Sequence, residues 1–321
     1  MGIYIGGMAL KFKRVLVTGG AGFIGSHLVD ALVAQGCRVG VLDNLSTGNL
    51  ANLAQVSDHI EFHTGDIRDL PLLLELSTGC DVIFHLAAEV SVPRTVENPV
   101  VSAMINEMGT LHVLEAARQN GVPRVVFSSS CAVYGNGADG PKRETMTPDP
   151  LSPYAIQKLA GEYYARLYHD LYGVGAVCLR YFNVYGPRQD PSSPYSGVIS
   201  IFMTRAVSAK QPIIYGDGGQ YRDFVFVKDV VTANLLAAAT GGAAGSIFNV
   251  GTGSFVTVDR MWQDLCRMTG IAIRPEYAPQ RPGDILKSVA EINHIQAELG
   301  FKPEYTFEKG LSITLDWYKN M

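Results

Sequence analysis

Short runs of apolar residues alternate along the chain with longer stretches in which apolar residues recur at helical spacing. The short runs are continuously apolar, which is typical of parallel strands that helices cover on both faces. We predict strands at 13–18, 38–42, 60–63, 81–85, 124–127, 176–181 and 246–250, and helices at 23–35, 99–119 and 153–171. This alternation predicts βαβ units, and hence an α/β protein with a doubly wound parallel sheet of about seven strands.

The pattern changes after residue 181. Loops rich in Pro, Ser, Gln, Asp or Gly separate shorter elements there, at 187–197, 216–219 and 275–283. Such loops predict a smaller C-terminal α/β lobe built over one end of the sheet. We therefore place one domain at 1–180, joined by parts of 222–252, and a second at 181–321.

Composition and charge exclude several classes of protein. The 321 residues are 47% hydrophobic, and 26 basic against 30 acidic side chains give a formal net charge of −4. That balance offers no general attraction to nucleic acid or to an anionic membrane, so we expect neither as a partner. The uncharged stretch 230–258 is long enough to span a membrane, but its glycines and Asn249 predict a helix, a turn and a strand instead.

The five cysteines favour a reducing compartment. Their number is odd and none forms a C-x-x-C pair, which disfavours a disulfide framework and a zinc site. The seven histidines include no H-E-x-x-H, so we expect no metal. Basic residues follow the apolar run at 1–10, the reverse of their order in a signal peptide. We therefore expect a cytoplasmic protein whose translation starts at Met1 or Met8.

A glycine loop follows the first predicted strand. In the segment TGGAGFIG at 18–25, glycines 20, 22 and 25 fit G-x-G-x-x-G, and glycines 19, 22 and 25 fit a G-x-x-G-x-x-G variant. A strand before the loop and a helix after it are typical of Rossmann-type dinucleotide-binding domains, where the helix N-terminus holds a pyrophosphate. The residues expected at the cofactor are Gly19, Gly22, Phe23, Ile24 and Gly25.

Asp43 bears on the choice of dinucleotide. It ends the second predicted strand, 18 residues after Gly25. A carboxylate there accepts hydrogen bonds from the adenosine ribose and repels a 2′-phosphate. No Arg occurs at 43–48, so we predict NAD and not NADP.

Ser130, Tyr154 and Lys158 form a second group. Tyr154 and Lys158 lie four residues apart on one face of a predicted helix, and Ser130 closes the serine run after the preceding strand. A phenol with a pKa near ~10 is a poor base at neutral pH, but a neighbouring Lys cation and an oxidised nicotinamide would favour the phenolate. Tyr305 and Lys309 repeat the spacing, but no glycine loop or serine cluster leads to them. We therefore predict Tyr154 as the general base.

These motifs occur in an order known from one family. After the glycine loop come DN at 43–44, GDI at 65–67, HLAA at 85–88, SSS at 128–130, VYG at 133–135, Y-x-x-x-K at 154–158 and RYFN at 180–183. Over residues 13–317 the set resembles the extended short-chain dehydrogenase/reductases that act on nucleotide sugars. The chain is most similar to UDP-sugar 4-epimerases, above all the UDP-N-acetylglucosamine (UDP-GlcNAc) branch, through GPRQDP at 186–191, YSGVI at 195–199, GDGG at 216–219, RDF at 222–224 and RPGD at 281–284.

The resemblance implies roles for further residues. It places at NAD the residues Asp43, Asn44, Ser46, Thr47, Gly48, Asp66, Ile67, Leu86, Ala87, Ala88, Asn106, Ser128, Tyr154, Lys158 and Tyr181. It places at a UDP-sugar the residues Ser91, Ser130, Tyr154, Asn183, Gln189, Val198, Tyr215, Arg222, Arg281, Asp284 and Ser288. Arg222 and Arg281 would bind the diphosphate through charge-assisted contacts, and Asn183 would hold a phosphate oxygen.

The resemblance also implies a homodimer. The family usually pairs two helices of each subunit, and the matching stretches here are 99–119 and 153–171. Their apolar residues permit such an interface, but a face buried within one subunit would show the same pattern.

Ser288 bears on the choice of sugar. In the family, a bulky Tyr four positions after the Asp of R-x-G-D restricts the pocket to hexoses, whereas a small residue leaves room for an N-acetyl group. Ser288 occupies that position here. We therefore predict an NAD-dependent 4-epimerase, an isomerase, that interconverts UDP-GlcNAc and UDP-N-acetylgalactosamine (UDP-GalNAc) through a 4-keto intermediate. The small residue also permits UDP-glucose and UDP-galactose.

Alternative functions remain on the same scaffold. A 4,6-dehydratase needs an acid and a base, which the family supplies as Asp-Glu before Val-Tyr-Gly, and this chain has Cys131-Ala132 there. A decarboxylase and a uronate epimerase stay open. A different class of function is a non-catalytic redox sensor that binds NAD. The intact Ser130, Tyr154 and Lys158 argue against it, because a sensor needs only the cofactor loop.

Overall fold

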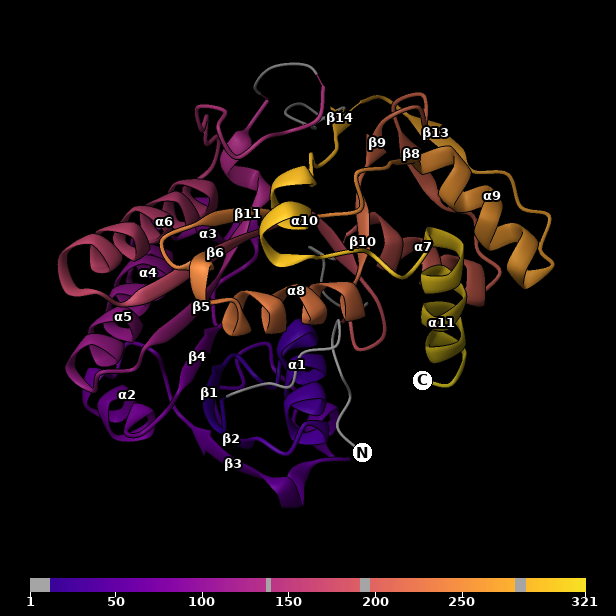
Figure 1. Ribbon diagram of the computed structural model, residues 1–321. Coiled ribbons are helices and arrows are strands. Elements are labelled where there is room, and N and C mark those ends of the chain that lie inside the picture. Colours follow the sequence, from indigo (N-terminus) through magenta and orange to yellow (C-terminus); the bar gives the residue numbers. More distant parts are fainter. Residues whose placement is uncertain (1–11, 137–139, 191–196, 281–286) are drawn as a thin grey trace.

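The computed structural model describes residues 12–136, 140–190, 197–280 and 287–321, and its centre is a parallel sheet (Figure 1). The seven strands run in the order β11-β6-β5-β4-β1-β2-β3, with all neighbouring pairs parallel. Their bounds are β1 (Arg14–Thr18), β2 (Arg38–Asp43), β3 (Ile60–Thr64), β4 (Val82–His85), β5 (Arg124–Ser130), β6 (Gly175–Tyr181) and β11 (Ile247–Val250). The predicted doubly wound sheet is confirmed.

Helices cover both faces of this sheet (Figure 1). Alternate strand residues serve the two layers, so Val15 and Val17 join one apolar core while Leu16 between them joins the other. Against the first core pack α1 (Phe23–Ala34), α8 (Val227–Ala239) and α10 (Asn293–Leu299). Against the second pack α2 (Leu70–Ser77), α5 (Gly109–Gln119) and α6 (Pro153–Tyr172). The continuously apolar strands of the sequence follow from this double cover.

The helix expected over 99–119 is not continuous. After α3 (Val92–Glu97), the chain forms α4 (Pro99–Ala103), a π-helical turn (Met104–Met108) and then α5. A π turn holds one residue more than an α turn and is frequent at functional sites. Here it carries Asn106, whose side chain is buried.

The described part of the C-terminal lobe consists of small sheets and helices beside the main sheet (Figure 1). Its strands pair as β7 (Asn183–Tyr185) with β10 (Phe224–Phe226), β8 (Ile213–Tyr215) with β13 (Glu276–Ala278), and β9 (Tyr221–Arg222) with both β12 (Val256–Thr257) and β14 (Lys287–Ser288). Its helices are α7 (Val198–Val207), α9 (Val258–Thr269) and α11 (Phe307–Lys319). A third apolar core around Trp262 and Phe202 holds them together.

The chain passes between the two parts more than once. It leaves the main sheet after β6, builds β7 to β10, and returns through α8 and β11 before completing the lobe. Residues 227–239 and 247–250 therefore lie with the main sheet, while the division at residue 180 stays a prediction. Within the described ranges, none of the helices combines the length and apolar character that a membrane crossing needs.

Candidate active site

The glycine loop fits a bound dinucleotide. Gly19 has a φ of +72°, and a Cβ there would lie 2.7 Å from the backbone nitrogen of Ala87 on the loop after β4. A Cβ at Gly25 would clash with the carbonyl oxygen of Gly19. Gly22 precedes α1 and supplies no side-chain cap to its first amides. The loop thus lets the backbone come close to a pyrophosphate, at the switch point between β1 and β4 where ligands of such sheets bind.

Asp43 fastens the end of β2 to this loop. Its carboxylate accepts hydrogen bonds from the backbone amides of Ala21, at 2.9 Å, and Leu45, at 2.8 Å. A Cβ at Gly48 would lie 2.7 Å from Oδ1 of Asp43, so this position needs glycine. Asp43 is therefore fixed at the expected edge, beside the exposed Ser46 and Thr47.

Arg68 is a residue at this edge that the sequence reasoning missed. Asn44 donates to Asp66 at 3.0 Å, and Asp66 binds the guanidinium of Arg68 through two further bonds. The Arg68 hydrogen bonds hold the pKa of Asp66 at about 2, so the pair stays ionised. Arg68 lies outside the segment 43–48 in which no Arg occurs, and it comes to this edge because it follows β3, which pairs with β2.

Asn106 shapes the loop after β4. It accepts a hydrogen bond from the amide of Glu89 at 2.8 Å and donates to the Glu89 carbonyl at 3.0 Å and to Gln157 at 2.7 Å. The side chain thus fixes Glu89, while the amides of Leu86 and Ala87 donate to Thr18 beside the glycine loop. The contact of Asn106 with the cofactor stays a prediction.

Tyr154 and Ser130 come together at the carboxyl end of β5. Ser152 caps α6 by accepting from the amide of Ala155 at 3.2 Å, and Pro153 opens the helix, so Tyr154 lies in its first turn. The Tyr154 hydroxyl and Ser130 share a hydrogen bond. One turn later, Lys158 donates to the carbonyl of Ser128 at 2.7 Å, with its Nζ 5.8 Å from the centre of the Tyr154 ring. The three predicted catalytic side chains therefore lie side by side.

Burial dominates the titration of both groups. It raises the pKa of Tyr154 to about 12, with the Ser130 hydrogen bond acting in the opposite direction. It lowers the pKa of Lys158 to about 8, with the charge of Glu162 opposing it. The expected lowering of the phenol's pKa therefore does not come from Lys158 alone, and a second positive charge is needed to make Tyr154 a base.

A buried ion pair lies behind Lys158. Glu162, one turn further along α6, binds Arg180 of β6 at 2.6 and 2.8 Å and accepts from Ser129 at 2.5 Å. Both partners are almost fully buried. The sequence reasoning missed Glu162, although its place four residues after Lys158 on the same helix face was a signal.

Part of the expected substrate set gathers opposite Tyr154. Ser288 stands beside Arg222 in the β14–β9 register, and its side chain shares a hydrogen bond with the thiol of Cys131. Cys131 follows Ser130 and is close enough to Tyr154 to influence its pKa. The sequence reasoning used Cys131 only to disfavour a dehydratase, because its contact with Ser288 joins segments far apart in the chain.

Other residues expected at the substrate or the cofactor have partners of their own. Ser91 caps α3 through the amide of Arg94, and Tyr181 binds Ser128 and Asn234 through its hydroxyl. Gln189 donates to the carbonyl of Val184. Val198 opens α7 and Tyr215 ends β8. Ile67, which was expected at the cofactor, is buried. Arg281 and Asp284 lie outside the described residues.

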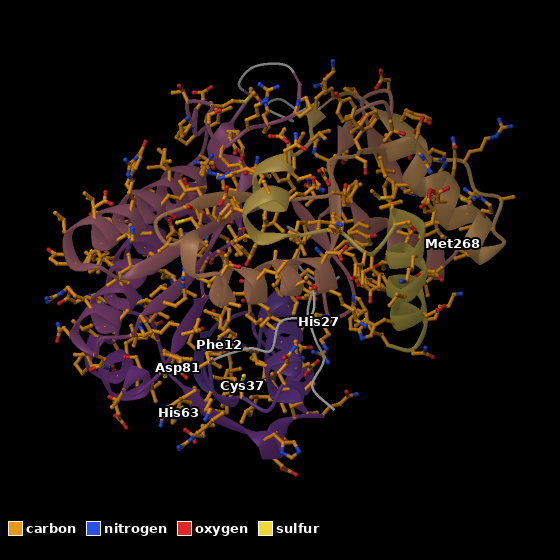
Figure 2. The ribbon with its side chains drawn as sticks, viewed as in Figure 1. Phe12, His27, Cys37, His63, Asp81 and Met268 are labelled. Carbon is orange, nitrogen blue, oxygen red and sulfur yellow. The ribbon has the colours of Figure 1, made fainter. Side chains whose placement is uncertain are left out.

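The loop that follows β7 is fastened to α1. His27, which is labelled in Figure 2, contacts the carbonyl of Pro187 at 2.9 Å. Asp30 pairs with Arg188 at 2.8 Å. Burial lowers the pKa of His27 to about 4, so its ring is neutral and donates this bond at neutral pH. The helix that begins at the glycine loop thus also carries the loop expected at the substrate.

Comparisons with known proteins agree with this geometry. Residues 15–251 match the model of the NAD-dependent epimerase/dehydratase family. The chain belongs to this family. The prediction from the sequence that the cofactor is NAD is thereby confirmed. The glycine loop, Asp43 and the loop after β4 would hold this cofactor.

Relatives within the family are similar over nearly their whole length. The UDP-glucose 4-epimerase of Mycolicibacterium smegmatis is 42% identical, with 96% of this chain and 99% of the relative covered. The UDP-GlcNAc 4-epimerase of Methanobrevibacter ruminantium, solved with UDP-N-acetylmuramic acid, is 40% identical with a TM-score of 0.93, covering 97% and 99%. A dTDP-glucose 4,6-dehydratase of Streptomyces niveus is 35% identical, covering 96% and 93%. The family therefore includes epimerases and dehydratases of nucleotide sugars.

The second Tyr-x-x-x-Lys pair has other surroundings in this family member. Tyr305 precedes α11 instead of lying on it, and its ring packs on Phe226 at 4.6 Å between centres. Lys309 lies 4.3 Å from the centre of the Tyr305 ring. The hydrogen bond of Ser130 goes to Tyr154, so Tyr154 keeps its predicted place as the base.

Proposed function

We propose that this protein is a UDP-sugar 4-epimerase that interconverts UDP-GlcNAc and UDP-GalNAc and also accepts UDP-glucose and UDP-galactose. The observation that carries the proposal is the set of side chains around Tyr154. Its hydrogen-bond partner is Ser130, its neighbour Cys131 contacts Ser288, and Ser288 stands beside Arg222. This set supplies one proton-transferring group and a small residue at the sugar.

The reaction needs one proton to move at the sugar 4-hydroxyl. NAD supplies the acceptor and donor of hydride when it is bound. Tyr154 takes the proton of the 4-hydroxyl as the 4-keto sugar forms, and Ser130 holds the phenol and the sugar oxygen together through its hydroxyl. After the keto sugar has turned within the pocket, Tyr154 returns the proton to the oxygen on C4.

The pKa of Tyr154 makes Lys158 and a second cation part of this step. Burial raises the phenol's pKa to about 12, far above neutral pH. A Lys158 that keeps its proton, with the positive charge of an oxidised nicotinamide, favours the phenolate. Glu162 helps to keep Lys158 charged, because its carboxylate raises the lysine's pKa against the effect of burial.

The diphosphate must stay anchored while the sugar turns. Arg222 and Asn183 are the described residues that we assign to this anchor. A fixed diphosphate with a loosely held sugar allows two poses of the ring, so hydride can return to either face. The two 4-epimerase relatives support the proposed reaction, and the one solved with UDP-N-acetylmuramic acid holds an N-acetylated sugar.

A dehydratase is the main rival within the family. A relative of that activity is 35% identical to this chain. Loss of the 6-hydroxyl needs an additional acid and base beside the sugar. Cys131 and Ala132 occupy the place where the resemblance puts those groups, and burial raises the pKa of Cys131 to about 11, so its thiol is not ionised at neutral pH. We therefore favour the epimerase.

Turnover of several UDP-sugars side by side tests the proposal. The NAD-loaded protein is incubated with UDP-GlcNAc, UDP-GalNAc, UDP-glucose and UDP-galactose, and products are separated by anion-exchange chromatography. We expect the 4-epimer from each N-acetylated sugar, with Tyr154→Phe as the inactive control. A 4-keto-6-deoxy product would identify a dehydratase. Conversion of UDP-galactose without UDP-GalNAc would identify a hexose epimerase.

The homodimer is part of the same proposal. The apolar side chains of α3, α4 and α6 that point outward include Val96, Val100, Val101, Leu167 and Leu171, each between 49% and 76% exposed. Exposed apolar side chains on helices that pack together favour an interface with a second copy of the chain. Light scattering should give the mass of two chains, and Leu167→Glu should shift it to one.

A further inference from the structure

Asp223 is a buried carboxylate at the junction of the lobe's short strands. The residue is 0% exposed. Its Oδ1 accepts from the amide and the hydroxyl of Thr252, at 2.8 and 2.7 Å. Its Oδ2 accepts from the amides of Gly253, at 3.0 Å, and Ala290, at 3.1 Å. Four donors from two separate segments thus converge on one carboxylate.

The backbone of Asp223 extends the same junction. Its amide donates to the carbonyl of Ser288 at 2.8 Å. Its carbonyl accepts from the amide of Asn183 at 3.0 Å and from the Asn183 side chain at 3.2 Å. Arg222 is the preceding residue in the chain. Asp223 therefore contacts or adjoins Arg222, Asn183 and Ser288, three residues that we assign to the diphosphate and the sugar.

The surrounding strands are too short to fix this arrangement by themselves. β9, β12 and β14 have two residues each, so each offers few ladder hydrogen bonds. A buried carboxylate is costly unless donors satisfy it, and once satisfied it holds those donors firmly. The space is also full, since a Cβ at Gly251 would lie 2.7 Å from Oδ2 of Asp223.

We propose that Asp223 is a positioning residue for the substrate. By joining β9, β14, β7 and the loop after β11, it fixes Arg222, Ser288 and Asn183 relative to one another, and so holds the diphosphate while the sugar turns. It acts on substrate binding and not on proton transfer at Tyr154. This role rests on the proposed function, because the ligand it serves is the UDP-sugar.

Asp229 provides a matched control. It is 1% exposed, on α8, and its carboxylate accepts from the backbone amides of Glu304 at 2.9 Å and Tyr305 at 3.3 Å. The segment that it joins carries none of the residues assigned to substrate or cofactor. Like Asp223, Asp229 is a buried carboxylate that accepts hydrogen bonds from backbone amides. Unlike Asp223, it does not adjoin the residues assigned to the substrate.

The experiment compares Asp223→Asn with Asp229→Asn in the NAD-loaded enzyme. Asparagine keeps the size of the side chain but replaces one carboxylate oxygen by an NH2 group. That group cannot accept a hydrogen bond, so the donors to that oxygen lose their acceptor. For Asp223→Asn we expect KM for UDP-GlcNAc to rise about 10- to 100-fold, with a much smaller change in kcat. Calorimetry should show a matching loss of affinity for UDP and unchanged affinity for NAD. Asp229→Asn should lower the melting temperature and leave KM unchanged.

Thr252→Val keeps the test decisive if Asp223→Asn fails to fold. It removes only the hydroxyl donor and keeps the branched shape, so KM should rise by a smaller factor in a folded enzyme. An unchanged KM and UDP affinity in the folded variants, or an equal rise in KM in Asp229→Asn, would overturn the positioning role. A wild type that binds UDP but epimerises no UDP-sugar would instead refute the proposed function, while the loss of UDP affinity in Asp223→Asn would still support the positioning role.

Discussion

Replacing Lys158 by methionine should make the protein more stable near neutral pH while removing most of its activity. Lys158 is 4% exposed, and burial lowers its pKa from an ordinary 10.5 to about 8. Each pKa unit corresponds to about 1.4 kcal/mol, so holding this charge inside costs about 3 kcal/mol of folding free energy. Methionine fills a similar volume without the charge.

The loss of one hydrogen bond offsets part of this gain. The Lys158 ammonium donates to the Ser128 carbonyl at 2.7 Å, and leaving that carbonyl unpaired costs about 1–3 kcal/mol. The net gain at pH 7 is therefore at most about 2 kcal/mol, equivalent to about 3 °C in melting temperature for a chain of this length. The kcat should fall about 10²- to 10⁴-fold, because Tyr154 loses the cation that favours its phenolate.

The pH dependence gives this prediction its sign. Below pH 8 the lysine is charged in both the folded and the unfolded state, so the cost of burial is present in full. Between pH 8 and 10.5 the folded state is neutral and the unfolded state still binds a proton, so the free energy of unfolding rises with pH. Relative to Lys158→Met, the wild type should therefore regain about 3 kcal/mol between pH 7 and 10.5.

Urea unfolding at several pH values measures the difference, and kcat is measured in parallel. Lys309→Met is the control, because Lys309 is exposed beside Tyr305 and should change neither the pH dependence nor the activity. A difference between wild type and Lys158→Met that stays constant from pH 7 to 10 would refute the argument from burial. Retained activity would refute the role of Lys158 in the reaction.

Three further substitutions test the remaining assignments. Tyr154→Phe should lose about 10²- to 10⁴-fold in kcat and still bind NAD and UDP-sugar, whereas Tyr305→Phe should keep its turnover. The reverse pattern would show that Tyr305 is the base and not Tyr154. Asp43→Ala should weaken NAD binding in calorimetry and reduce the preference over NADP, and equal binding of both by the wild type would contradict that role. Ser288→Tyr should depress kcat/KM for UDP-GlcNAc far more than for UDP-glucose, and parallel losses would exclude Ser288 as the gate.

The parts of the fold that follow from local pattern could be predicted from the sequence. The sheet followed from continuously apolar runs, and the glycine loop followed from its place between a strand and a helix. The contact of Ser130 with Tyr154 was predictable because one closes β5 and the other opens the next long helix. Each of these inferences uses residues that are close in the chain or at the same edge of a parallel sheet.

Contacts between distant segments could not be predicted in this way. Cys131 meets Ser288 and Asp223 meets Ala290 only because the two-residue strands of the lobe bring them together. Short strands have no hydrophobic period long enough to recognise. The burial that raises the pKa of Tyr154 also depends on this packing. The spacing in the sequence therefore predicted Lys158 as the neighbour of the phenol, but not that the pKa of the phenol is raised.

The π-helical turn at Met104–Met108 links the inside of the protein to its outer surface. One residue in a helix corresponds to a rotation of about 100°, so the extra residue sets the angular phase between α4 and α5. In the present phase Val100 and Val101 face outward, Asn106 reaches Glu89 and Gln157, and the buried side of α5 meets the sheet. Deleting one residue from the turn would rotate one of these faces out of place. A one-residue insertion or deletion in this turn would therefore change the angle between the exposed face of α4 and the buried face of α5, so the exposed apolar surface and the contacts of Asn106 depend on the same helix geometry.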